Sequence, residues 1–362
     1  MVQKTPNFDW KSRSDLSKLV FMLIVGAGTG SFAKWINLPL PFLMGGVVST
    51  ISLISLANPR SISLPYPKPL RMWFVALIGT LIGSTFSPGL AKTIPNLTAS
   101  LLAVIVYVGV AHCLGYAIFR TFGKYGRVTS FYAAMPGGFI EAVELGTKDG
   151  GDPFVLTLSH LLRVLFVVVV VPLLFGISSG DVVVSVGEQG SEIGLVRWKD
   201  LTVILIIALV GFIVGRIIKM PAAHLIGPMF MSALCHGTGL VDTSAPSWLL
   251  YAAQLFVGVA LGSQLSGAFG SNYVKIVKTS LLATTLMLCL SATMAWSLIR
   301  VTNLDFSALF LSFAPGGVSE MGLIALSLGT SPVIVAVHHV FRIFVTVLIA
   351  AITTKSASRW LP

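Results

Sequence analysis

The chain has 362 residues, of which 55% are hydrophobic and only 10% are charged, and its mean hydropathy is +0.91. Soluble globular domains carry about 25% charged residues, so this composition excludes an ordinary soluble domain and indicates a surface that faces lipid. The net charge of +11 lies mostly in short loops between apolar runs, which is typical of cytoplasmic loops rather than of a nucleic-acid-binding face.

Apolar segments predict two sets of membrane helices. A charged tail at 1–18 precedes a first membrane repeat at 19–175, a polar linker lies at 176–200, and a second repeat at 201–354 precedes a tail at 355–362. The apolar segments lie at 19–36, 41–57, 72–86, 97–119, 128–147 and 153–175, then at 201–218, 222–235, 248–265, 276–299, 304–328 and 332–352. Crossing ~30 Å of hydrocarbon takes about 20 residues, and backbone in lipid must satisfy its own hydrogen bonds. The predicted fold class is therefore all-α, a polytopic transmembrane helical protein.

The two sets carry the same polar signature, 179 residues apart and without a gap. The matched residues are Pro136, Gly137, Gly138, Glu141, His160 and Arg163 in the first copy, and Pro315, Gly316, Gly317, Glu320, His339 and Arg342 in the second. Glycines at 79 and 83 match those at 258 and 262 at the same offset, a small-residue spacing that lets helix backbones approach closely. The chain is therefore interpreted as a duplicated membrane protein whose few intramembrane charges occupy equivalent positions.

The segments at 128–147 and 304–328 each contain the Pro-Gly-Gly motif. Proline removes a backbone donor and fixes φ, and paired glycines allow a sharp turn, so we expect a broken helix or a re-entrant hairpin at each motif. Such backbone survives at membrane depth only where it lines a cavity or is buried in protein.

Loop charges predict the topology. Basic residues cluster in alternate loops of each half, whereas the central linker is acidic. All the basic loops lie on one side only if each half crosses the membrane an odd number of times. This favours ten spans plus two re-entrant hairpins, with inverted halves and both termini in the cytoplasm, over twelve spans.

Glu141 and Glu320 each lie three residues after the last glycine of their motif, in the first turn of the helix that should follow. Two interpretations remain open. Each carboxylate could cap exposed amide groups and complement the helix dipole, or it could bind a cation or proton, because ionisable groups at membrane depth usually face a cavity.

The His-x-x-Arg pairs place histidine and arginine on one helix face in each half. Arg163 and Arg342 could pair with the nearby glutamates, or their guanidinium groups could bind an anionic substrate. Glu144 and His338 have no counterpart in the other half, so an asymmetric role would fall on them. Two glutamates and two histidines could in principle ligate a metal, but no metal-site, nucleotide or nucleophile motif accompanies them, and we expect no resident metal or cofactor.

A duplicated Pro-Gly-Gly-x-x-Glu followed by a distal His-x-x-Arg resembles the AbrB family, most closely at residues 314–321 in the second copy. The resemblance covers nearly the whole chain. It implies a bacterial inner-membrane protein and brings two labels, regulator of gene expression and ammonia monooxygenase. The second label has no support in the residues, because no copper or iron ligand set is present.

The preferred hypothesis is an ion-coupled secondary transporter of a small solute, for which an anion is one option. It rests on the duplication, the paired breaks and the matched charges; the likeness to sodium–proton and bile-acid carriers is a fold-level analogy. The alternatives are a membrane-embedded regulator of gene expression and, third, a membrane enzyme. The expected partners are the lipid bilayer, the solute and a coupling ion, H⁺ or Na⁺; an oligomer is compatible, and direct nucleic-acid contact is not expected.

Overall fold

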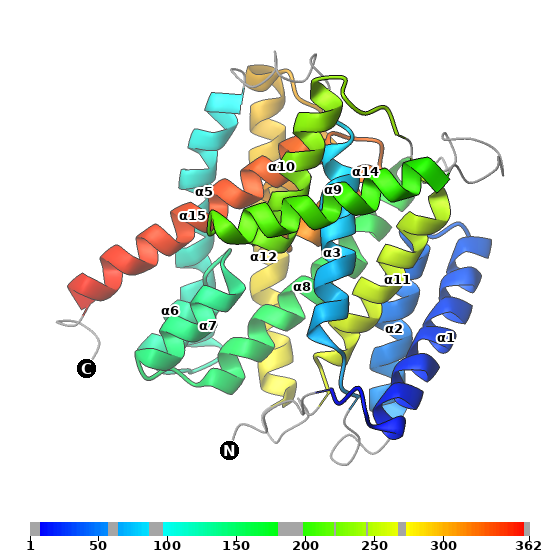
Figure 1. Cartoon of the computed structure of the whole chain (residues 1–362). Coiled ribbons are helices and arrows are strands. Elements are labelled where there is room, and N and C mark those ends of the chain that lie inside the picture. The colour runs from blue at the N-terminus through cyan, green and yellow to red at the C-terminus, as the bar shows by residue number, and fades with distance from the viewer. Residues whose placement is uncertain are drawn as a thin grey trace.

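The computed structural model describes residues 8–56, 64–86, 97–179, 198–220, 222–243, 245–266 and 273–357. These residues form fourteen helices and no strand, which confirms the predicted all-α class (Figure 1). The first half contains α1 (Arg13–Trp35), α2 (Pro41–Leu56), α3 (Lys68–Gly83), α5 (Leu97–Thr121), α6 (Arg127–Ala133), α7 (Phe139–Lys148) and α8 (Pro153–Ser179). The second contains α9 (Trp198–Ile217), α10 (Ala223–Gly237), α11 (Ser247–Ser263), α12 (Tyr273–Thr302), α13 (Phe306–Phe313), α14 (Val318–Ser327) and α15 (Pro332–Ala357).

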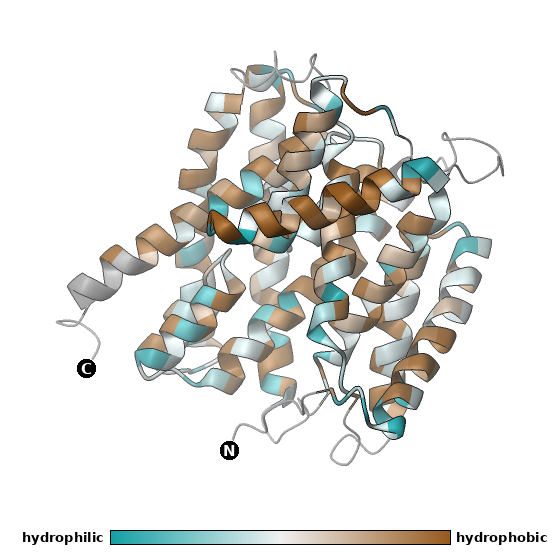
Figure 2. Ribbon diagram, in the orientation of Figure 1, coloured by the Kyte–Doolittle hydropathy of each residue, from teal (hydrophilic) through white to brown (hydrophobic). Residues whose placement is uncertain are grey.

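Six of these helices are long and apolar enough to cross a membrane: α1, α5, α8, α9, α12 and α15. They occupy the same three places in each half, and the shorter helices α2 and α3 likewise match α10 and α11 in order. Hydrophobic residues run along the outer helices, whereas hydrophilic residues gather at helix ends and around α6 and α7 (Figure 2). These lengths and this distribution are those of a membrane protein.

Close glycine contacts join the two halves. α3 packs against α10 and α2 against α11. A Cβ added at Gly83 of α3 would lie 2.6 Å from the Cβ of Ser232, and one added at Gly262 of α11 would lie 2.7 Å from the Cβ of Thr50. The close backbone approach predicted from the glycine spacing is therefore confirmed at equivalent places in both halves.

The other helix contacts also occur in equivalent pairs, in which each helix is replaced by its counterpart from the other half. α5 lies beside α12, the contact of α12 with α8 is matched by that of α5 with α15, and the contact of α1 with α11 is matched by that of α9 with α3. Helices of one half therefore pack among helices of the other, and the halves do not form two separate bundles. Of the predicted linker, residues 180–197 lie outside the described residues, as do the chain ends at 1–7 and 358–362.

Candidate functional site

Both predicted breaks are present. The first separates α6 from α7 and the second separates α13 from α14. Gly138 adopts a left-handed conformation with φ of +63°, which glycine reaches without a steric penalty. Its counterpart Gly317 is extended, with φ of −79° and ψ of 153°. The two breaks therefore share a sequence motif but not a backbone conformation.

The histidines bind main-chain carbonyls at the ends of the broken helices. Nε2 of His160 donates to the carbonyl of Tyr132 at 3.0 Å, and Nε2 of His339 donates to the carbonyl of Leu311 at 2.9 Å. Because a carbonyl oxygen only accepts, Nε2 carries the proton in both rings. The two acceptors are themselves 179 residues apart, so the fold repeats the contact as faithfully as the sequence repeats the motif.

The arginines bind the same helix ends. Arg163 donates from Nη1 to the carbonyl of Met135, and Arg342 donates from Nη1 to the equivalent carbonyl of Ala314. Nη1 of Arg342 also donates to the carbonyl of Phe313 at 3.1 Å, and Nη2 donates to that of Gly316 at 2.9 Å. The last carbonyls of a helix have no partner within it and carry the negative end of its dipole. The guanidinium groups therefore cap α6 and α13.

This geometry excludes one of the two interpretations of the arginines, the pairing with glutamate, as far as the described residues go. Arg342 has four of its five N–H groups engaged, since Nη2 also contacts Nδ1 of His339 at 3.1 Å, and only Nε is unpaired. Neither Arg163 nor Arg342 forms an ion pair with Glu141 or Glu320 in the described part of the chain. A glutamate–arginine pair within each half is not the arrangement adopted.

The two Pro-Gly-Gly motifs meet at one side chain. A Cβ added at Gly137 would lie 3.6 Å from Nε of Arg342 and 3.3 Å from the hydroxyl of Thr346 on α15. Arg342 binds the carbonyl of Gly316 through its other end. The break of the first half therefore lies against the residue that caps the break of the second half.

Glu320 lies in the first turn of α14 and is only 3% exposed. Its carboxylate accepts a hydrogen bond from the Ser319 hydroxyl at 2.8 Å, and its ion-pair partner is Arg71 on α3 of the other half, with Nη2 3.8 Å from Oε1. Among the described residues no main-chain amide donates to this carboxylate, so a capping role is not what the geometry provides.

Arg71 and His224 were not predicted as site residues. Arg71 lies in the first turn of α3 with a side chain 36% exposed. His224, in the first turn of α10, lies within electrostatic range of both Arg71 and Glu320. Nothing in the sequence links these positions, because the contact exists only after α3, α10 and α14 pack together.

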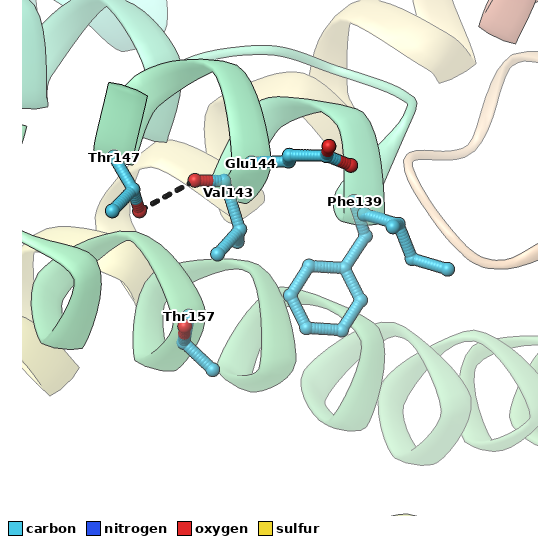
Figure 3. Close-up of a pocket in the computed structure, with 6 residues that line it drawn as sticks. Phe139, Val143, Glu144, Thr147 and Thr157 are labelled. Carbon is cyan, nitrogen blue, oxygen red and sulfur yellow. Dashed lines mark hydrogen bonds between the residues drawn. The ribbon is translucent and has the colours of Figure 1, made fainter. Parts of the chain in front are cut away.

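The first copy of the motif is different. Glu141 is half-buried, and Glu144 is exposed at a pocket of about 430 Å³ between α7 and α8 (Figure 3). The residue of α11 equivalent to Arg71 is Leu250, which offers no charge. His338 is fully buried and joins α15 to α5, with Nε2 accepting from the Ser100 hydroxyl at 2.8 Å.

The covering of the two motifs also differs. α14 packs against α3, where the side chain of Ile82 lies directly on Gly322. In the first half α7 packs mainly against α6 and α8. The position equivalent to Gly322 is Val143, and it lines the open pocket. One motif is thus covered and ion-paired, whereas the other is open.

Comparisons with known proteins place this chain in a family. A family model described as "Transition state regulatory protein AbrB" matches residues 48–358. The chain is 22% identical over 333 residues to "Putative regulator AbrB" of Escherichia coli (strain K12), covering 90% of this chain and 92% of the relative. It is also 22% identical over 358 residues to "Uncharacterized protein YhjN" of Bacillus subtilis (strain 168), covering 93% of this chain and 92% of that relative. Neither name describes an enzyme.

Proposed function

Since this chain belongs to the AbrB family, we propose that it is an ion-coupled secondary transporter of a small solute. Its place would be the inner membrane of a bacterium, with both termini in the cytoplasm. The proposal requires inverted halves, so that the two Pro-Gly-Gly breaks face opposite sides of the membrane, as in carriers built from inverted repeats.

The observation that carries the proposal is the unequal state of two equivalent motifs. Glu320 is buried under α3 and paired with Arg71, whereas Glu141 is half-buried on the helix whose Glu144 borders a pocket, and it pairs with no residue of the described chain. In a carrier that alternates between two open states, each half in turn is covered while the other is exposed.

Glu320 is the proposed site of the coupling ion. Its partner Arg71 approaches to 3.8 Å, which is longer than a good charge-assisted hydrogen bond, and the Arg71 side chain is 36% exposed. Binding of H⁺ or Na⁺ at the carboxylate would remove the attraction to Arg71. The contact between α3 and α14 would then weaken, which couples ion binding to opening of this side.

Reconstitution in liposomes tests the proposal. We expect the purified protein to dissipate an imposed pH gradient or to take up ²²Na⁺, and Glu320→Gln to abolish this flux. Metabolite profiles of medium and cytosol from deletion and overexpression strains identify the solute. An absence of ion flux together with unchanged metabolite profiles would overturn the transporter proposal.

A membrane-embedded regulator is the second candidate, and the printed name of the Escherichia coli relative favours it. A regulator needs an output surface, so a defined cytoplasmic protein should co-purify with the chain and dissociate when the basic loops are neutralised. Co-purification of such a partner from a chain that moves no ion would favour this function over transport.

A further inference from the structure

We infer that the pocket between α7 and α8 binds a primary ammonium group that carries an apolar substituent. This inference rests on the proposed function insofar as it names the class of solute. The pocket volume of about 430 Å³ lies within the range of small-molecule sites. Its walls come from α7 and from Thr157 of α8, one turn away from His160.

The walls are mainly apolar, and one carboxylate stands among them. The lining side chains are Phe139, Ile140, Val143, Glu144, Thr147 and Thr157. In Figure 3 the ring of Phe139 reaches from α7 toward α8, and Glu144 and Thr147 extend from the same helix. A flat ring beside a carboxylate suits a cation that has a hydrophobic part.

No ion pair neutralises the charge at the pocket within the described residues. Glu141 and Glu144 lie three residues apart on α7, so both project to one side of that helix. Neither carboxylate has an ion-pair partner in the part of the chain that the structure describes. In a chain with a net charge of +11, this is a local concentration of negative charge, and it favours a cationic ligand.

A buried imidazole nitrogen provides an independent reason. His160 is fully buried, and its ring contacts that of Phe139 with centroids 5.7 Å apart. Because Nε2 donates to the Tyr132 carbonyl, Nδ1 is an acceptor, and it has no partner. In the other half the equivalent nitrogen of His339 is occupied by Arg342 at 3.1 Å. The first copy therefore keeps a free lone pair on a ring that contacts Phe139, a residue of the pocket wall.

Counting donors and acceptors gives the class of ligand. The Thr147 hydroxyl donates to the Val143 carbonyl at 2.7 Å, so only its lone pairs remain for a ligand. Glu144 accepts at the pocket wall, and the Thr157 hydroxyl there can accept as well as donate; Glu141 and Nδ1 of His160, which lie near the wall but do not line the pocket, are acceptors too. A primary ammonium offers three donors and no acceptor, which complements this set, whereas a carboxylate or phosphate would face repulsion.

An ammonium of this kind could belong to a free amine or to the ethanolamine headgroup of a lipid. Both ligands would place an ammonium group at Glu144. They differ in the group that contacts the apolar wall, which is the substituent of a free amine in one case and the rest of the lipid in the other. Phenethylammonium is a suitable probe of the first, and nanodiscs of phosphatidylethanolamine compared with phosphatidylcholine test the second.

Isothermal titration of the full-length protein in detergent free of phosphatidylethanolamine tests the inference. We expect phenethylammonium to bind, phenethyl alcohol not to bind, and Glu144→Gln to weaken binding by at least about tenfold, the loss of one charge-assisted hydrogen bond. Val143→Trp should fill the pocket and abolish binding. Asp242→Asn, which removes another exposed carboxylate away from the pocket, is the matched control and should bind as the parent does.

The outcomes separate this inference from the proposed function. Equal binding by the parent and Glu144→Gln, or no binding by the parent, would overturn the pocket assignment even if ion flux through Glu320 persists. Glu144-dependent binding without ion flux and with unchanged metabolite profiles would keep the pocket and refute the transporter. If the probe binds only after lipid is removed and phosphatidylethanolamine blocks it, the occupant is the lipid headgroup.

Discussion

Replacing Arg342 with lysine distinguishes a structural arginine from a substrate-binding one. Lysine keeps the positive charge but loses the planar fork that reaches several acceptors at once. In the structure the guanidinium donates to the carbonyls of Phe313, Ala314 and Gly316 and contacts His339. A single ammonium at this depth can keep about two of these four contacts.

The magnitude follows from the contacts that are lost. A hydrogen bond to a charged group contributes about 1.5 kcal/mol or more, so the loss of two lowers the free energy of unfolding by about 3 kcal/mol. Arg163 makes one such contact among the described residues, to Met135, which a lysine ammonium can keep, so Arg163→Lys should cost less than about 1.5 kcal/mol. The duplication thus supplies a matched control inside the same chain.

The assay is thermal unfolding in detergent, followed by tryptophan fluorescence, in parallel with ion flux in liposomes. Arg342→Lys should lower the melting temperature clearly more than Arg163→Lys, and any surviving folded protein should still transport. Unchanged melting with complete loss of flux would refute the reasoning, since the guanidinium would then serve a substrate rather than the end of α13.

Three further outcomes are expected. Glu320→Gln should insert normally and lose flux together with its pH dependence; flux that survives unchanged would show that this carboxylate binds no coupling ion. Gly258→Ala should destabilise the fold because its Cβ would overlap the Leu43 carbonyl, whereas Gly28→Ala, in open space, should be neutral or slightly stabilising; melting temperatures in detergent compare the two. A reporter tag in the linker near Glu188 should report the periplasm and terminal tags the cytoplasm, and a cytoplasmic linker would contradict inverted halves.

The sequence by itself determined the helices, the duplication and the two breaks. Hydropathy over about 20 residues, a proline followed by two glycines, and a constant offset are local or arithmetical features, and they do not depend on how helices pack. For this reason the apolar segments coincide with the helices to within a few residues, and α6 and α13 end just before the predicted motifs.

Only the tertiary structure decided the partners of the charged groups. Arg342 binds the end of α13 rather than Glu320, and Glu320 instead meets Arg71, which lies in the other half of the chain. The sequence gives equal copies of the motif but not their unequal covering, in which α3 lies on α14 while α7 borders a pocket. A guanidinium takes whichever acceptors the packed helices bring within about 3 Å, and that choice depends on contacts between residues far apart in the chain.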